Sequence, residues 1–78
     1  MINGLQIKMA RAALGLSLQE LASSAGLSEK TIRRIEAEGR ETNASIKTIN
    51  AVKAALEAAG IEFIGTPDDR PGIRINTK

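Results

Sequence analysis

Residues 16–38 read LSLQELASSAGLSEKTIRRIEAE, and this stretch decides the fold. Ser17 is a favourable N-cap, and Glu20, three residues later, completes a capping box, so a helix is predicted to begin directly after Ser17. Its apolar residues repeat at spacings of three and four, and Gly26 stands where a left-handed residue would end the helix. Ser28 is a second N-cap, and neither proline nor glycine follows it within the stretch. Two short capped helices joined by a tight turn are typical of a helix-turn-helix.

The second of these helices has two different faces. At about 100° per residue, its apolar side is formed by Thr31, Ile32 and Ile35. The opposite side carries Lys30, Arg33, Arg34 and Ala37. The first side is therefore predicted to pack inside the protein, and the second is predicted to face solvent.

Residues 14–39 resemble the helix-turn-helix of the phage-repressor-like family, the group that contains lambda repressor and Cro. The matching positions are Gly15, Leu16, Ser17, Glu20, Leu21, Ala22, Gly26, Leu27, Ser28, Ile32, Ile35 and Glu36. With the helices on either side, the resemblance extends over residues 5–59. It implies a mainly α, four-helix DNA-binding domain that reads the major groove of double-stranded DNA with the helix of residues 29–38.

The resemblance also implies which side chains read bases. They are the first two of the third helix and one about a turn further on, here Glu29, Lys30 and Arg34, and Arg33 shares their outward face. Lysine and arginine suit guanine edges, and Arg34 could donate to O6 and N7 together. Glu29 can accept from cytosine N4 but repels phosphate. It either adds specificity or marks a surface that is not used on DNA.

Three further side chains are candidates for phosphate contacts: Ser17, Lys8 and Arg40. Arg40 follows the third helix, where an exposed loop arginine without a DNA role is equally ordinary. The resemblance implies a clamp between Arg11 and Glu36, and the alternative is a solvated arginine on the surface.

The remaining helices are predicted from caps and periodicity. Asn3, with Gln6 at the box position, begins a first helix that ends at Gly15. The start of the fourth helix is left open within residues 42–45, because several side chains there can cap it. Gly60 is predicted to end it. Its apolar stripe is Ile46, Ile49, Val52, Leu56 and Ala59.

A C-terminal β-hairpin is predicted after Gly60, because residues 61–64 and 73–76 have the pattern of strands. The turn formers GTPDDRPG between them predict a loop of eight residues. The apolar side chains that need cover are Ile61, Phe63, Ile73 and Ile75. We expect them at a two-fold dimer interface that would set two reading helices at major grooves about 34–36 Å apart. The alternatives are packing on the chain's own helices, and a tail that is partly disordered until it binds.

Length and composition limit the domain organisation and the classes of protein that this chain can represent. The chain has 78 residues, enough for one small domain. Together with the motif, this predicts a helix-turn-helix domain over residues 1–59, with its motif at 17–38, and a possible dimerisation element over 60–78.

The chain has no cysteine, no histidine and one aromatic residue, so disulfide scaffolds, most metal sites and most enzymes are disfavoured. No cofactor or metal is expected. Asp68 and Asp69 could bind a hard cation, but without a third acid they are interpreted as turn formers. No apolar run is long enough to span a membrane, so a cytoplasmic protein is expected.

Two functions remain as hypotheses. The favoured one is a sequence-specific regulator of transcription that binds double-stranded DNA as a homodimer, without enzymatic activity. The net charge of +2 is compatible with DNA but does not by itself predict it. The alternative is a module that keeps the frame but binds another protein, such as a regulator or a toxin, through Leu18 and Glu29 or through the hairpin.

Overall fold

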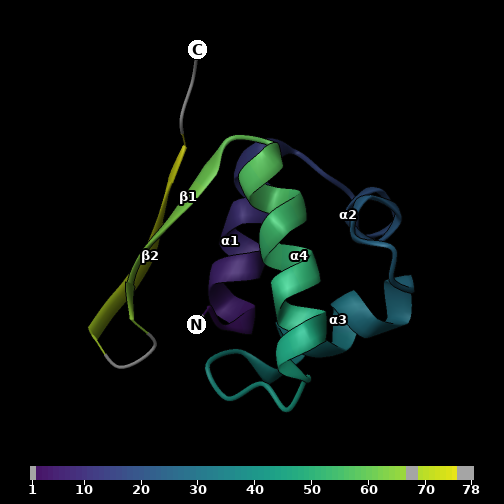
Figure 1. The fold of residues 1–78 in the computed structure, drawn as a ribbon, viewed down its shortest axis with the longest axis horizontal. Helices are drawn as coiled ribbons and strands as arrows, with labels where there is room; N and C mark the ends of the chain where they lie inside the picture. Colours follow the sequence, from purple (N-terminus) through teal and green to yellow (C-terminus); the bar gives the residue numbers. More distant parts are fainter. Residues whose placement is uncertain (1, 67–68, 76–78) are drawn as a thin grey trace.

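A computed structural model describes residues 2–66 and 69–75, although nothing is described of the side chains of residues 65–71. Four helices are followed by an antiparallel hairpin (Figure 1). The elements are α1 (Gly4–Leu14), α2 (Leu18–Ala25), α3 (Glu29–Glu38), α4 (Ile46–Ala58), β1 (Ile61–Thr66) and β2 (Asp69–Ile75). The predicted fold class, a mainly α four-helix domain with a C-terminal hairpin, is confirmed.

Local capping explains where the helices begin and end. The four N-caps are Asn3, Ser17, Ser28 and Ser45. Each cap oxygen accepts a hydrogen bond from a backbone amide of the first turn. Such an amide has no acceptor within the helix itself. Gly15 and Gly26 end α1 and α2 at φ angles of 69° and 70°, a region in which glycine carries no steric cost. α4 ends one residue earlier than predicted, with Ala59 rather than Gly60 at its C-cap.

The hydrophobic core lies between the helices and the hairpin. α1 and α4 run side by side in the middle of the molecule, with α2 and α3 on one side and the hairpin on the other (Figure 1). The buried apolar side chains are Ile2, Ile7, Ala10, Leu21, Ala22, Ile32, Ile35, Ile49, Val52, Leu56 and Ile61. The predicted stripe of α4 is wrong at Ile46, which is 66% exposed because it lies at the first position of the helix, beyond the packed part. It is also wrong at Ala59, which is exposed.

α1 and α3 meet at a close backbone contact. The amide of Gly4 donates to the carbonyl oxygen of Gly39 at 2.7 Å. A Cβ atom at Gly4 would overlap the carbonyl oxygen of Ile35, so a glycine is required here for steric reasons. This contact fixes the C-terminal end of α3 against the beginning of α1.

The strands of the hairpin are longer than predicted. β1 runs on to Thr66 and β2 begins at Asp69, with an irregular register between Ile64 and Thr66. The prediction of an eight-residue loop is therefore wrong. Both strands are edge strands, and this setting tolerates the proline and glycine within β2. Residues 67–68 and 76 lie outside the described residues, as do the side chains of Asp68 and Asp69.

The hairpin packs on the helices of its own chain. Ile61 is 2% exposed in the core, and Phe63 and Ile73 pack against the core. Gln6 of α1 reaches across, and its Nε2 donates to the carbonyl oxygen of Gly72 at 3.0 Å. Ile61, one of the four side chains expected at a dimer interface, is thus enclosed by its own chain, and the dimer itself stays a prediction. Ile75, at the end of β2, is 47% exposed.

Candidate nucleic-acid interface

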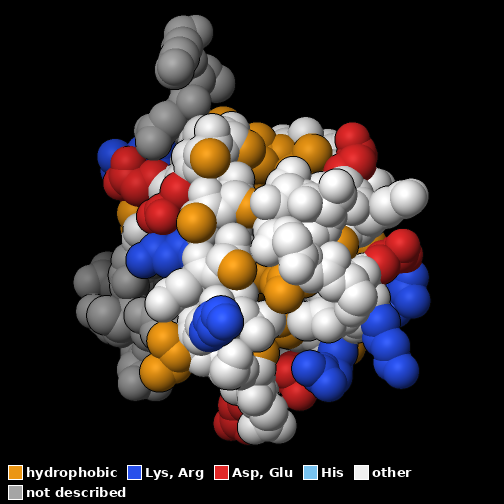
Figure 2. Space-filling view, turned by 45° about the vertical axis from the view of Figure 1, so that its right-hand side comes forward, with side chains coloured by type: hydrophobic (Ala, Val, Ile, Leu, Met, Phe, Trp, Pro, Cys, Tyr) orange, Lys and Arg blue, Asp and Glu red, His pale blue; other side chains and the backbone are white. Residues whose placement is uncertain are grey.

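α3 lies at the edge of the molecule and has one buried and one open side. Ile32 and Ile35 are fully buried, as the periodicity predicted. Lys30, Arg33 and Arg34 are exposed on the opposite side. Figure 2 shows Lys and Arg side chains gathered on this part of the surface, with acidic side chains next to them.

Each acidic side chain of α3 has a partner. Glu29 accepts from Arg33 at 2.7 Å, one turn along the helix. Glu36 pairs with Arg11 of α1. Glu38 accepts from the Thr42 hydroxyl at 2.9 Å and from the Asn43 amide at 3.2 Å. This role of Glu38 could not be predicted from the sequence, since it depends on the course of the loop after α3.

These pairings leave two cations of α3 available. Lys30 and Arg34 form no ion pair with any residue in the described part of the chain. They are four residues apart, so they lie next to each other on one side of the helix. The open side of α3 therefore presents two adjacent, exposed cations next to a neutralised ion pair.

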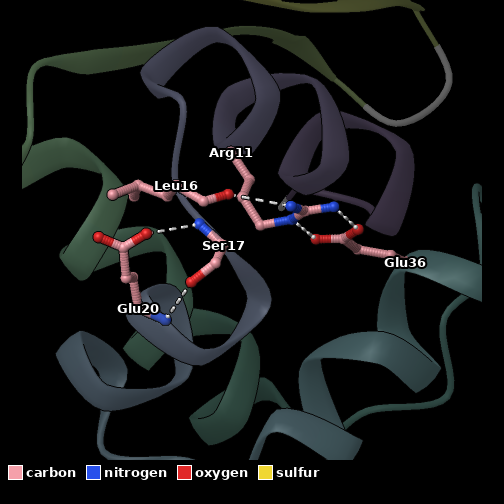
Figure 3. A network of polar contacts seen from close by, with 5 residues as sticks. All are labelled: Arg11, Leu16, Ser17, Glu20 and Glu36. Atoms are coloured by element: carbon pink, nitrogen blue, oxygen red, sulfur yellow. Dashed lines mark hydrogen bonds and ion pairs between the residues drawn. The ribbon is translucent and has the colours of Figure 1, made fainter.

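An ion pair between Arg11 of α1 and Glu36 of α3 joins these two helices (Figure 3). Arg11 Nε donates to Glu36 Oε2 at 2.7 Å, and Nη2 donates to Oε1 at 3.0 Å. Nη1 donates to the carbonyl oxygen of Leu16 at 3.0 Å, in the turn between α1 and α2. The hydrogen bond and charge of Glu36 raise the pKa of Arg11 although its burial opposes this, so the guanidinium stays charged. The side chains of Arg11 and Glu36 are 20% and 7% exposed. Their bidentate pair joins α1 to α3, and the bond to Leu16 adds the turn before α2.

The beginning of α2 differs from the expectation of an open phosphate site. The Ser17 amide donates to Glu20 Oε1 at 2.9 Å, and the Glu20 amide donates to Ser17 Oγ at 3.0 Å (Figure 3). These hydrogen bonds with Ser17 lower the pKa of Glu20, so a negative charge already lies where a phosphate would bind. Leu18, the first residue of α2, packs against the core. Its apolar side chain therefore contributes to the fold of this chain.

The other two candidate phosphate contacts are open to solvent. Lys8 on α1 and Arg40 directly after α3 are both exposed. Neither forms an ion pair with a residue whose side chain the structure describes. The described residues also contain no group of three or more His, Cys, Asp or Glu side chains that could hold a metal ion. Among the helices described, none is long and apolar enough to cross a membrane.

Comparisons with known proteins agree with this architecture. The family model HTH_3, helix-turn-helix, matches residues 7–61. A solved structure of a SinR protein/SinI protein complex is similar over 73% of this chain, with 40% identity and a TM-score of 0.62. A structure of SinR, the master regulator for biofilm formation, in complex with DNA is similar over 69% of this chain, with 39% identity and a TM-score of 0.61. This chain covers 53% of the first of these chains and 87% of the second. No curated protein sequence matches.

Proposed function

The chain belongs to the HTH_3 helix-turn-helix family, the lambda repressor and Cro-like group, and we propose that it is a sequence-specific regulator of transcription. In this proposal α3 enters the major groove of double-stranded DNA. The observation that carries it is the open side of α3, where Lys30 and Arg34 are exposed while each acidic side chain of the helix has a partner. The likeness to SinR solved in complex with DNA supports the same function.

The chemistry of the two free cations suits guanine. Guanine presents the acceptors O6 and N7 in the major groove, and a guanidinium can donate to both at once. Arg34 is the side chain for this contact, and Lys30 donates to a neighbouring base. The Arg11–Glu36 clamp holds α3 in place from its other side, so these donors approach the DNA from a rigid element.

Phosphate contacts would set the register of α3 in the groove. Lys8 and Arg40 are suited to this because both are exposed and carry a free positive charge. Ser17 is a weaker candidate, since the Glu20 carboxylate at the same helix end repels phosphate. With so few phosphate contacts in each copy, affinity depends mainly on base contacts and on the number of copies bound.

A homodimer on a palindromic operator remains part of the proposal. Two copies would double the few contacts that one copy makes, and a palindromic operator would match the two-fold symmetry of the dimer. The hairpin lies on the opposite side of α1 and α4 from α3 (Figure 1), and its inner face covers its own core. The dimer contact is therefore expected outside that inner face. The mass of the free protein and of its operator complex, measured by light scattering, tests for two copies.

A protein partner is the second candidate function. The SinR/SinI complex supports it, because that SinR chain was solved bound to another protein. On this chain Ile64 and Ile75 of the hairpin are 38% and 47% exposed and could contact such a partner. This function is favoured over the first if the purified chain binds no DNA even at low salt.

The test begins with selection of a preferred operator from random duplex DNA, followed by gel shifts with selected and scrambled duplexes. Arg34→Ala is expected to weaken specific binding by about 1–3 kcal/mol and to relax the base preference at one position. Lys8→Ala should weaken binding to both duplexes and reduce the salt slope by about one. The control is Arg74→Ala, which removes a cation from the exposed hairpin. An equal loss on both duplexes for Arg34→Ala would contradict base reading.

A further inference from the structure

The ion pair at the beginning of α3 lies at the end of the helix that would lead into the groove. Ser28 caps α3, Glu29 is its first residue, and Arg33 follows one turn later. Arg33 Nη2 donates to Glu29 Oε1 at 2.7 Å. The side chains of Arg33 and Glu29 are 63% and 45% exposed, so both are accessible to DNA.

The pair has little to do with stability. Exposed ion pairs at this spacing contribute very little to folding, because solvent screens the charges and both side chains lose freedom. Neither Glu29 nor Arg33 belongs to the hydrophobic core. The effect of the pair is therefore local, on the position and charge of two side chains beside Lys30 and Arg34.

The pairing has two consequences for the open side of α3. The charge of Arg33 is balanced by Glu29, so Arg33 adds little to the attraction for phosphate. The Glu29 carboxylate is restrained through Oε1, while Oε2 keeps its capacity to accept a hydrogen bond. The Glu29–Arg33 pair thus presents Glu29 Oε2 to DNA as an oriented acceptor. This oxygen is repelled by phosphate oxygens and by the acceptor atoms of bases.

Among the bases, cytosine is the best partner for such an acceptor. Its major-groove edge presents the N4 amino donor without an acceptor on the same base. Adenine also has an amino donor, at N6, but its N7 acceptor lies next to it and repels a carboxylate. Guanine and thymine present acceptors at the corresponding positions of their edges.

We propose that Glu29 selects a cytosine by accepting from its N4 amino group, and that Arg33 is a positioning residue that holds the Glu29 carboxylate for this contact. The proposal rests on the proposed function, since it requires α3 to lie in the major groove. It assigns to Arg33 a role through Glu29, in place of a direct contact with a base or phosphate. Glu29 and Arg33 should consequently govern the same operator position, whereas Arg34 governs another.

The experiment is operator selection from random duplex DNA with five full-length proteins: wild type, Glu29→Gln, Arg33→Ala, Arg33→Lys and Arg34→Ala. All five should keep the same helix content in circular dichroism, because the changed side chains are exposed. The wild type should prefer cytosine at one position by about tenfold or more, as expected for a good base contact. Glu29→Gln should prefer adenine there, since glutamine can pair with N6 and N7 together.

Arg33→Ala should lower the cytosine preference at that same position by about twofold, the size expected of an exposed ion pair at this spacing, and leave the other positions unchanged. Arg33→Lys should restore most of the preference, because an ammonium can still donate to the carboxylate. Arg34→Ala is the matched control, because it should change a guanine position and leave the cytosine position intact.

Two results would overturn the inference alone. One is an Arg33→Ala protein that loses preference at a position unaffected by Glu29→Gln, which would show that Arg33 contacts DNA itself. The other is a Glu29→Gln protein with the wild-type base profile. A wild-type chain that enriches no sequence at all would instead overturn the proposed function, and the inference with it.

Discussion

At the scale of single residues, the placement of α3 depends on the contact between Arg11 of α1 and Glu36 of α3. Arg11 joins α1, the following turn and α3 through its bonds to Leu16 and Glu36. The Glu36 side chain is only 7% exposed, so water cannot replace its partner. A charge in this position is tolerated because the guanidinium matches both oxygens, and removal of one partner leaves the other charge buried.

Arg11→Ala should therefore lower the free energy of unfolding by about 3 kcal/mol, because the buried Glu36 side chain would lose its partner. Arg11→Lys should lose less, since an ammonium keeps the attraction but cannot make both bonds to the carboxylate and a third to Leu16. Urea unfolding of the three proteins measures this. A wild-type stability for Arg11→Ala would show that the pair does not hold α3 in solution.

At the scale of elements, the helices were predictable because their signals are local. The N-cap and the glycine that ends the helix lie in one short stretch of sequence for α1, α2 and α3. The periodicity of α3 alone separates Ile32 and Ile35 from Lys30 and Arg34. The length of the hairpin strands was not predictable, because residues between them became strand only through pairing across the ribbon. The predicted capping box occupies the Ser17 amide with Glu20, so this helix end is less suited to a phosphate than its serine alone indicates.

The capping box of α2 predicts a dependence on pH. Hydrogen bonds with Ser17 lower the pKa of Glu20 in the folded protein. A carboxyl group of this kind stabilises the fold above its ordinary pKa of about 4.3, and the contribution disappears as the pH falls through the lowered value.

Glu20→Gln, which keeps an acceptor oxygen but not the charge, should consequently melt below the wild type at pH 7. The difference between the two melting temperatures should shrink as the pH is lowered below the ordinary pKa of a glutamate. Thermal unfolding by circular dichroism measures it, with Glu57→Gln on the exposed side of α4 as the control for loss of a carboxylate. A difference that grows on acidification would contradict the assigned cause.

At the scale of the whole molecule, the hairpin belongs to the same folding unit as the helices. It contributes Ile61 to the core, and Gln6 ties the carbonyl oxygen of Gly72 to α1. Whether a marginal two-stranded ribbon packs on its own chain or on a second copy depends on tertiary contacts that strand patterns do not encode. For this reason the sequence could predict the hairpin but not its partner.

Two isoleucines of β1 test whether the hairpin packs on its own chain. Ile61→Ala should lower the free energy of unfolding by about 2–4 kcal/mol, because it opens a cavity in a closed core. Ile64→Ala removes the same side chain from a site that is 38% exposed and should cost less than about 1 kcal/mol. Both values should be independent of protein concentration. Equal losses, or a loss at Ile61 that depends on concentration, would point to cover by a second copy.

The central claim, that α3 reads DNA from the major groove, is tested most directly by methylation interference on the selected operator. Methylation of guanine N7 alters the major-groove edge, whereas methylation of adenine N3 alters the minor groove. The wild type is predicted to be excluded by N7 methylation at specific guanines and to tolerate N3 methylation, and Arg34→Ala is predicted to become indifferent to one of those guanines. Interference confined to adenine N3, or an Arg34→Ala pattern identical to that of the wild type, would contradict it.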